Sequence, residues 1–473
     1  MVQTQASPAL RLVLPTVLPI RGAGVSIGLQ LAQTLREAIH SGRLASGARL
    51  PPSRDAARQL GVGRNAIVEA YEHLAADGLL EARGRQGSFV ATHVPRQPAQ
   101  TAFVRTSARK PAERFAALPH LDWRLGQTGG QPLPLKVWRT ACREAGRHLP
   151  PAGYGDPRGL EDLRQSIAEW LRRERGVHYE PEQIIVTQGA GAAIDMLVSF
   201  LVRPGDRCVV EAPGYPRALL AMQRAGAHVA EVAVDAQGMN VELAFDLPPR
   251  LLHMTPSHQY PTGSRLSGAR RRLLAQLVVR DGALLIENEY DHEFVFEGQN
   301  HAPLAASIPE HTLLVSTFAK AISPALRIGF VAAPVSVAEG LSQSIEQSRS
   351  HVSWPVQVSM QWLLRSGQMQ RHLRRIRRHY AELRQQLLRA VGEKCPGLRV
   401  RGQQGGLHIV LCAGTLQRDQ HLIRSLRQAG VVLDTLRDFG SAEDAALLGY
   451  GHMSSKDVEA ACGALALAWQ RCR

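Results

Sequence analysis

The chain has 473 residues, 44% of them hydrophobic and 21% charged, which allows one large domain and one or two small ones with ordinary globular cores. No apolar run approaches the roughly 20 residues of a membrane span and the N-terminus lacks a signal-peptide pattern, so we expect a cytoplasmic protein with no membrane partner. The six cysteines include no Cys-x-x-Cys pair, which predicts neither a metal site nor a disulfide framework, whereas the net charge of +15 favours a polyanionic partner.

Residues 25–93 are predicted to fold as three short helices followed by a β-hairpin. The first helix ends at Ser41, the second begins near Ser53, whose hydroxyl is expected to cap it, and the third ends at Asp77. Strand-like residues then flank a basic turn at Gly84. The apolar residues that mark the helices are Leu31, Leu35, Ala38 and Ile39 in the first, Ala56, Ala57 and Leu60 in the second, and Ile67, Tyr71 and Leu74 in the third.

This order of elements is typical of a winged helix-turn-helix, whose third helix enters the major groove of double-stranded DNA. Arg54 opens the second helix, Arg64 and Asn65 open the third, and Arg83 and Arg85 flank the turn of the hairpin. Arg suits guanine edges and phosphates, and Asn suits adenine, so we expect these five side chains to contact DNA. For each of them taken alone, the role of a solvated surface residue stays open.

The same segment resembles the GntR family of bacterial regulators. The resemblance rests on Leu-Pro-Pro-Ser-Arg at residues 50–54, Gly-Val-Gly-Arg at 61–64 and Gly-Ser-Phe-Val at 87–90. One departure is Gly63, where the family commonly has a serine whose hydroxyl caps the third helix.

Residues 94–122 are rich in Pro, Gln, Ala and basic residues and lack periodicity, which predicts a linker. From residue 123 to 473, short apolar runs alternate with amphipathic helices, which favours an α/β domain with a mainly parallel central sheet covered on both faces. Ligands of such sheets bind beyond the carboxyl ends of the strands. The predicted strands are residues 183–187, 208–211, 228–234, 251–254, 283–286 and 312–316.

Several residues that follow these strands are suited to bind a phosphate or to react with an aldehyde. A turn of Gly189, Ala190 and Gly191 precedes a helix and offers backbone N–H groups to a phosphate. Lys320 follows the last predicted strand and is one of five lysines in an Arg-rich chain. A lysine can lose its proton and attack an aldehyde, which an arginine cannot do, so Lys320 is a candidate for forming a Schiff base.

This constellation resembles the fold-type I enzymes of the aminotransferase class I/II group, which use pyridoxal 5'-phosphate (PLP). The resemblance implies that Lys320 forms a Schiff base with PLP and that Tyr154 reaches the cofactor of the partner subunit in a homodimer. Ordinary structural roles stay open for Tyr154, Tyr290, Arg217 and His258. The other residues implied in the pocket are Gly189, Ala190, Gly191, Thr317 and Arg327 at the phosphate, Tyr290 at the ring hydroxyl, Asn288 at the ring nitrogen, and Tyr215, His258 and Arg217 along the walls, with Arg217 the candidate for effector binding.

The sequence departs from this enzyme pattern at two places. The partner of the ring nitrogen is an acid in the family, whereas Asn288 is a neutral amide that leaves the ring a weaker electron sink. Glu287 and Glu289 flank it, but their side chains should point to the opposite face of the strand. The C-terminal arginine that grips a substrate carboxylate is not evident, and Arg437 is only a nearby candidate.

A GntR-type winged helix joined to an aminotransferase-like domain is the architecture of the MocR/GabR group of regulators. The resemblance implies a PLP-dependent transcription regulator that binds DNA as a homodimer and senses PLP or an amino compound at Lys320. One alternative is a working aminotransferase that carries a DNA-binding domain. Another is a regulator whose PLP domain has become a dimerisation scaffold.

Overall fold

The computed structural model describes residues 25–92, 121–129, 131–298 and 301–472. The chain divides into two compact units, Met1–Arg114 and Phe115–Arg473, each of which is described here by itself. Within the described parts of the chain, no helix is long and apolar enough to cross a membrane.

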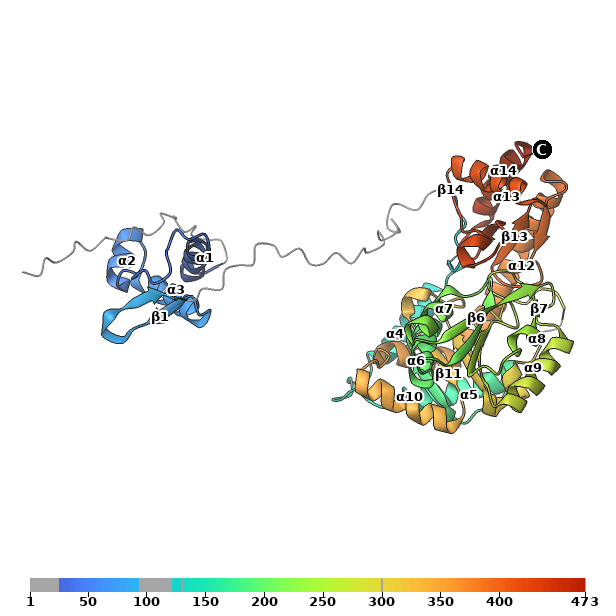
Figure 1. Ribbon diagram of the computed structural model, residues 1–473, viewed down its shortest axis with the longest axis horizontal. Helices are drawn as coiled ribbons and strands as arrows, with labels where there is room; N and C mark the ends of the chain where they lie inside the picture. Colours follow the sequence, from blue (N-terminus) through green and yellow to red (C-terminus); the bar gives the residue numbers. More distant parts are fainter. Residues whose placement is uncertain (1–24, 93–120, 130, 299–300, 473) are drawn as a thin grey trace, which may run out of the picture. The chain divides into compact units, whose positions relative to one another are not determined.

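The small unit contains the three helices and the hairpin that the sequence predicts (Figure 1). Its helices are α1 (Ile27–His40), α2 (Ser53–Leu60) and α3 (Arg64–Ala76), and its antiparallel strands are β1 (Leu80–Ala82) and β2 (Ser88–Val90). The turn of the hairpin is a 3-10 helix, Gly84–Gln86. The apolar faces are buried in one core, which includes Leu31, Leu35, Ile67, Leu74 and Val90.

The prediction that Ser53 caps α2 is wrong. The residue in the capping position is Pro52, which is extended (ψ 145°) and gives no side-chain hydrogen bond, while Ser53 is already helical. The Ser53 hydroxyl instead accepts a hydrogen bond from Nε of Arg64 at 3.4 Å. Gly63 caps α3 without a side-chain hydrogen bond, as expected from the missing serine.

The large unit is built on an eight-stranded sheet in the order β4-β11-β10-β9-β8-β5-β6-β7. Strands β10, β9, β8, β5 and β6 are parallel neighbours, which confirms the mainly parallel sheet. The antiparallel strand β11 between β4 and β10 was not predicted, because two of its four residues (Gly-Phe-Val-Ala) are glycine and alanine, which are depleted in strands. The strands are β4 (Ile184–Thr187), β5 (Arg207–Ala212), β6 (His228–Asp235), β7 (Gly238–Met239), β8 (Leu251–Met254), β9 (Leu284–Glu289), β10 (Thr312–Thr317) and β11 (Gly329–Ala332).

Helices cover both faces of this sheet (Figure 1). Along β10, Leu313 and Val315 pack on one face with α6 (Ala190–Leu201), α7 (Pro216–Arg224) and α10 (Val335–Ser348). Leu314 lies on the other face with α5 (Glu161–Arg175) and α11 (Trp354–Arg365). Farther along that second face lie α8 (Val241–Ala244) and α9 (Gly268–Asp281), and α4 (Leu135–Ala145) packs against α11.

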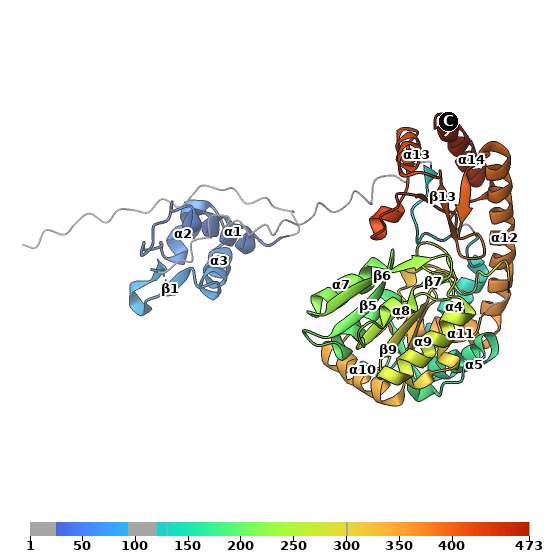
Figure 2. The same ribbon diagram turned by 45° about the vertical axis from the view of Figure 1, so that its right-hand side comes forward.

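The C-terminal part adds a three-stranded antiparallel sheet, β12-β13-β15, which α12 (Gln368–Lys394) connects to the helices of the main sheet (Figure 2). Its other elements are β12 (Arg399–Arg401), β13 (His408–Cys412), α13 (Leu416–Gln428), β14 (Val431–Val432), β15 (Ala446–Gly449) and α14 (Ser455–Gln470). β3 (Leu121–Asp122) pairs in parallel with β14. The last two residues of the predicted linker are therefore a strand of the large unit, and the rest of that linker lies outside the described residues.

Candidate functional site

A cavity of about 200 Å³ lies at the carboxyl ends of β4, β9 and β10. Nine of the residues that the sequence predicts for the cofactor line it: Gly189, Ala190, Gly191, Tyr215, Asn288, Tyr290, Thr317, Lys320 and Arg327. The remaining lining residues, which sequence reasoning did not select, are Gly126, Tyr260, Ala319, Pro324 and Ile328.

Lys320 follows β10 and places its amine inside this cavity. A Cβ atom added to Gly126 would lie 3.6 Å from Nζ of Lys320, so the backbone after β3 comes close to the amine. Burial lowers the pKa of Lys320 to about 8, while the charge of Asp291 opposes that shift. A substantial fraction of the Lys320 amine is thus neutral, and able to attack a carbonyl, near pH 8.

The Gly189 turn, Thr317 and Arg327 converge at one end of the cavity. Gly189 caps the amino end of α6 with φ 88°, a conformation that favours glycine. A Cβ added there would lie 3.9 Å from both Nη1 of Arg327 and Oγ1 of Thr317. The positive end of the α6 dipole, free backbone N–H groups and a guanidinium thus meet at one place, which suits a phosphate.

Asn288 is placed in the cavity by the alternation of β9. Glu287 accepts hydrogen bonds from the backbone N–H groups of Leu304 and Ala305, and Glu289 pairs with Arg175, so neither acid lines the cavity. Nδ2 of Asn288 lies 3.4 Å from Nε2 of His253, and within the described residues its Oδ1 is buried without a hydrogen-bond partner. This arrangement confirms that the two glutamates point away from the position of Asn288.

Three tyrosine rings form the aromatic wall of the cavity. The Tyr260 ring lies edge-on to Tyr215 at 5.7 Å and to Tyr290 at 5.6 Å between ring centroids. Tyr215 is stacked on the buried His253 at 6.0 Å, and burial lowers the pKa of His253 to about 4, so this ring is neutral. Tyr260 could have been found from its place two residues after His258, which the sequence predicts along the walls, in the loop of residues 255–263 that follows β8.

Three other predicted residues do not line this cavity. His258 lies behind the wall, where its Nδ1 is 2.9 Å from the Tyr290 hydroxyl. Arg217 pairs with Asp195 (Nε to Oδ2, 3.0 Å), and its Cδ lies 2.9 Å from where a Cβ of Gly191 would stand. Tyr154 is 66% exposed, and its ring lies beside that of His351, 5.5 Å between centroids, outside the cavity of Lys320.

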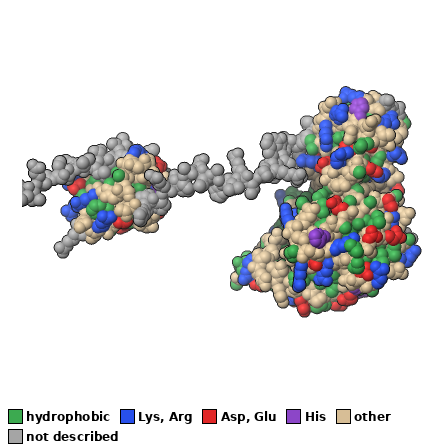
Figure 3. Space-filling model, viewed as in Figure 1, with side chains coloured by type: hydrophobic (Ala, Val, Ile, Leu, Met, Phe, Trp, Pro, Cys, Tyr) green, Lys and Arg blue, Asp and Glu red, His purple; other side chains and the backbone are tan. Residues whose placement is uncertain are grey.

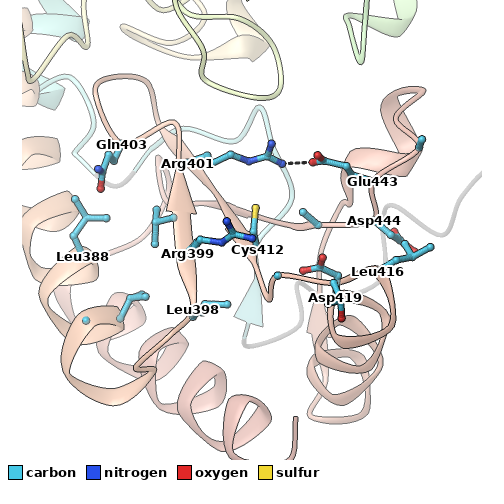
Figure 4. A pocket seen from close by; sticks show the side chains of 17 residues that line it. Leu388, Leu398, Arg399, Arg401, Gln403, Cys412, Leu416, Asp419, Glu443 and Asp444 are labelled. Atoms are coloured by element: carbon cyan, nitrogen blue, oxygen red, sulfur yellow. Dashed lines mark hydrogen bonds and ion pairs between the residues drawn. The ribbon is translucent and has the colours of Figure 1, made fainter. Parts of the chain in front are cut away.

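A larger cavity of about 800 Å³ lies between α12, β12 and α13 and contains none of the predicted site residues (Figure 4). Arg401 pairs there with Glu443 across the cavity, and Asp419 accepts a hydrogen bond from the backbone N–H of Ala413. Arg437, the candidate carboxylate-binding residue, pairs with Asp444 on this side (Nε to Oδ2, 3.3 Å). The Arg437 guanidinium therefore already has a carboxylate partner.

In the small unit, the amino ends of α2 and α3 expose the residues predicted to contact DNA. Arg54, Arg64 and Asn65 are exposed there, and basic side chains are visible on the face of the small unit seen in Figure 3. Arg83 is exposed in the wing, where it pairs with Glu81 and lies over the Phe89 ring. Arg85 belongs to the turn of the hairpin, but its side chain lies outside the described residues.

Replacing Arg64 by Ala should weaken binding of the full chain to its operator DNA by about 1 to 3 kcal/mol if Arg64 reads a base. We expect this loss because Arg64 stands at the start of α3, next to Ser53. Fluorescence anisotropy with a labelled operator fragment measures the effect. Arg58→Ala is the matched control, because Arg58 is an exposed arginine that pairs with Asp55 on the same helix as Arg54; equal losses in both variants would remove Arg64 from the contact set.

Comparison with known families divides the chain in the same way. Residues 28–90 match the bacterial regulatory proteins of the gntR family, and residues 123–465 match the family of aminotransferases class I and II. The chain is also 33% identical to the probable rhizopine catabolism regulatory protein MocR of Rhizobium meliloti, over 93% of this chain and 92% of MocR. The chain belongs to the MocR group of GntR regulators.

A second relative of this MocR-type chain matches it over nearly the whole length of both proteins. It is 32% identical to the pyridoxine biosynthesis transcriptional regulator PdxR of Corynebacterium glutamicum, over 90% of this chain and 92% of PdxR. Among solved structures, the α-aminoadipate aminotransferase LysN of Thermus thermophilus superposes with a TM-score of 0.67 at 24% identity, over 74% of this chain and 92% of LysN. The likeness to LysN shows that the large unit has the aminotransferase fold. This MocR-type chain is therefore a transcription regulator with a GntR helix-turn-helix and an aminotransferase-like domain.

Proposed function

We propose that this regulator binds PLP in the cavity around Lys320. The effector is either PLP itself or an amino compound that is sensed through the bound PLP. The observation that carries the proposal is the meeting, in one cavity, of a buried lysine of lowered pKa with the amino end of α6, which is suited to a phosphate. When bound, PLP supplies an aldehyde that condenses reversibly with primary amines.

The residues of the cavity fit the parts of PLP. The turn at Gly189, Thr317 and Arg327 would hold the phosphate, and the aromatic wall would enclose the pyridine ring. Tyr290 would hydrogen-bond the ring hydroxyl. Oδ1 of Asn288 is buried and has no hydrogen-bond partner among the residues that the structure describes, so it offers an acceptor at the remaining side of the ring. Lys320 holds or releases its proton at Nζ according to the pH.

Three further features support a regulator that responds to a ligand of this cavity. PdxR is named for pyridoxine biosynthesis, and PtsJ of Salmonella typhimurium, 27% identical, is named a repressor of vitamin B6 salvage.

Arg217 lies next to Gly191 and is a candidate for binding the acidic group of an amino compound once it leaves Asp195. The exposed Tyr154 would reach the cofactor of a second copy in a homodimer. A ligand changes DNA binding only if its affinity differs between the two states of the dimer.

Operator binding with and without PLP tests this function. We expect PLP to change the affinity of the full chain for a DNA fragment selected in vitro for binding to it. Lys320→Ala should bind the same fragment but lose the response to PLP, because it lacks the amine that captures the aldehyde. Lys394→Ala, an exposed lysine on α12, is the matched control and should respond like the wild type. No response in the wild type, or a full response in Lys320→Ala, would refute the proposal.

A further inference from the structure

His253 is a buried histidine that the proposed function does not use. It lies on β8, between β5 and β9, and is 1% exposed. Nε2 of His253 is 3.4 Å from Nδ2 of Asn288, and the His253 ring is stacked on Tyr215 at 6.0 Å between ring centroids. Asn288 and Tyr215 line the cavity of Lys320, whereas His253 does not. His253 therefore stands behind the cavity and contacts two of the residues that line it.

The hydrogen bond between His253 and Asn288 fixes the direction of the Asn288 amide. Burial lowers the pKa of His253 to about 4, so the imidazole is neutral and has one donor nitrogen and one acceptor nitrogen. Nδ2 of Asn288 can only donate, which makes Nε2 of His253 the acceptor and places the imidazole hydrogen on Nδ1. The amide oxygen Oδ1 is then directed away from His253. Within the described part of the chain, this oxygen is buried without a hydrogen-bond partner.

An unpartnered amide oxygen at this place favours a ligand that brings a donor to it. A buried acceptor without a hydrogen bond costs free energy, which a donor on the ligand restores. A pyridine nitrogen that carries hydrogen is such a donor, whereas one without hydrogen would face Oδ1 with its own lone pair. Glu287 and Glu289 do not replace Asn288 here, because they have the partners given above.

We propose that His253 is a positioning residue that holds the amide oxygen of Asn288 toward the ring nitrogen of PLP, so that the cavity binds PLP with a hydrogen on that nitrogen. This role rests on the proposed binding of PLP in the cavity. His253 acts through Asn288 and needs no contact of its own with the cofactor. A neutral acceptor holds the ring hydrogen less firmly than a carboxylate would, so the ring stays a weaker electron sink than in the enzymes of the family.

The tautomer of His253 in the cofactor-free protein tests how His253 holds Asn288. The full chain is prepared with ¹⁵N-labelled histidine, and its solid-state NMR spectrum is compared with that of His253→Phe to assign the two ring nitrogens. We expect a neutral ring with hydrogen on Nδ1 and a hydrogen-bonded Nε2. Asn288→Leu removes the donor and should shift the Nε2 resonance. Hydrogen on Nε2 in the wild type would overturn the proposal, because Oδ1 of Asn288 would then accept it and would not be free for a ligand.

The ring nitrogen of bound PLP tests the consequence for the cofactor. PLP with ¹⁵N in its ring is added to the full chain at neutral pH, and its resonance reports whether the nitrogen carries hydrogen. We expect a protonated nitrogen in the wild type and in His253→Gln, whose amide oxygen can also accept from Nδ2 of Asn288. His253→Phe keeps an aromatic ring beside Tyr215 but has no acceptor, so the resonance should move to that of an unprotonated nitrogen.

His408→Phe is the matched control for the loss of a buried histidine. Nε2 of His408 lies 2.9 Å from the carbonyl oxygen of Pro261, and its ring lies edge-on to Tyr260, so this variant should keep the protonated nitrogen. If His253→Phe fails to fold by circular dichroism, His253→Leu removes the acceptor with a smaller side chain and should give the same change. A protonated nitrogen in a folded variant without the acceptor, an unprotonated one in the wild type, or an equal change in His408→Phe would overturn the proposal.

Borohydride reduction of the same samples separates the role of His253 from the proposed function. A pyridoxyl label on Lys320 beside an unprotonated ring nitrogen in the wild type would overturn the role of His253 and leave the PLP site standing. No label on Lys320 would refute the PLP site, and the tautomer of His253 would still show whether Oδ1 of Asn288 is free.

Discussion

Replacing Arg327 by Ala should weaken the binding of PLP by about tenfold to a hundredfold, because the loss of hydrogen bonding between charged partners costs about 1.5 to 3 kcal/mol in total. Arg327 lines the cavity beside Gly189, and among the residues that the structure describes no acid forms an ion pair with it. Its guanidinium is therefore free to take a phosphate in two parallel hydrogen bonds. Equilibrium dialysis of PLP against the full chain measures the loss.

Arg217→Ala provides the comparison for this variant. Arg217 is close to the same turn, but it pairs with Asp195 and does not line the cavity. We expect its removal to change PLP affinity much less than the removal of Arg327, and to reduce the response to an amino compound if Arg217 binds the effector. A larger loss of PLP affinity in Arg217→Ala than in Arg327→Ala would mean that the phosphate lies elsewhere.

Asn288→Asp should raise the rate at which the protein transfers an amino group from an amino acid to PLP by about fivefold to tenfold. A carboxylate keeps the ring nitrogen protonated, and a charged hydrogen bond is stronger than a neutral one by about 1 to 1.5 kcal/mol. Position 288 meets the cavity, whereas the neighbouring acids Glu287 and Glu289 are turned away. Single-turnover absorbance changes with a panel of amino acids measure the rate.

Asn240→Asp is the control for the amide-to-acid exchange, because Asn240 caps α8 outside the cavity. It should leave the rate unchanged. An equal rate in the wild type and in Asn288→Asp would mean that something other than Asn288 limits the transfer. One such feature is the carboxylate-binding arginine, since the candidate Arg437 already pairs with Asp444.

The strand ends of the large unit could be predicted from the sequence because buried parallel strands are nearly continuous apolar runs. Lys320, Thr317 and the Gly189 turn stand at or after the ends of such runs, which predicts that they lie at one edge of the sheet. The structure places all of them in one cavity. The alternation of side chains along an extended segment was enough to separate Asn288 from its two flanking glutamates.

The rest of the site depends on contacts between distant segments, which no local pattern shows. The backbone at Gly126 comes close to Lys320 because β3 pairs with β14. The sequence gives no sign of that pairing. Oδ2 of Asp291 lies 2.8 Å from Nδ1 of His258 because the loop of residues 255–263 packs against it. Arg217 stood in a segment expected to line the pocket, but its pairing with Asp195 depends on how α6 packs against α7.

The most direct test of a PLP-binding regulator is borohydride reduction of the full chain with PLP, followed by mass mapping of the labelled peptide. The proposal predicts a visible absorption band on adding PLP, its loss on reduction, and a single pyridoxyl label on Lys320. Lys320→Ala should show neither the band nor the label. A label on another lysine, or the same band in Lys320→Ala, would contradict the assignment of this cavity as the PLP site.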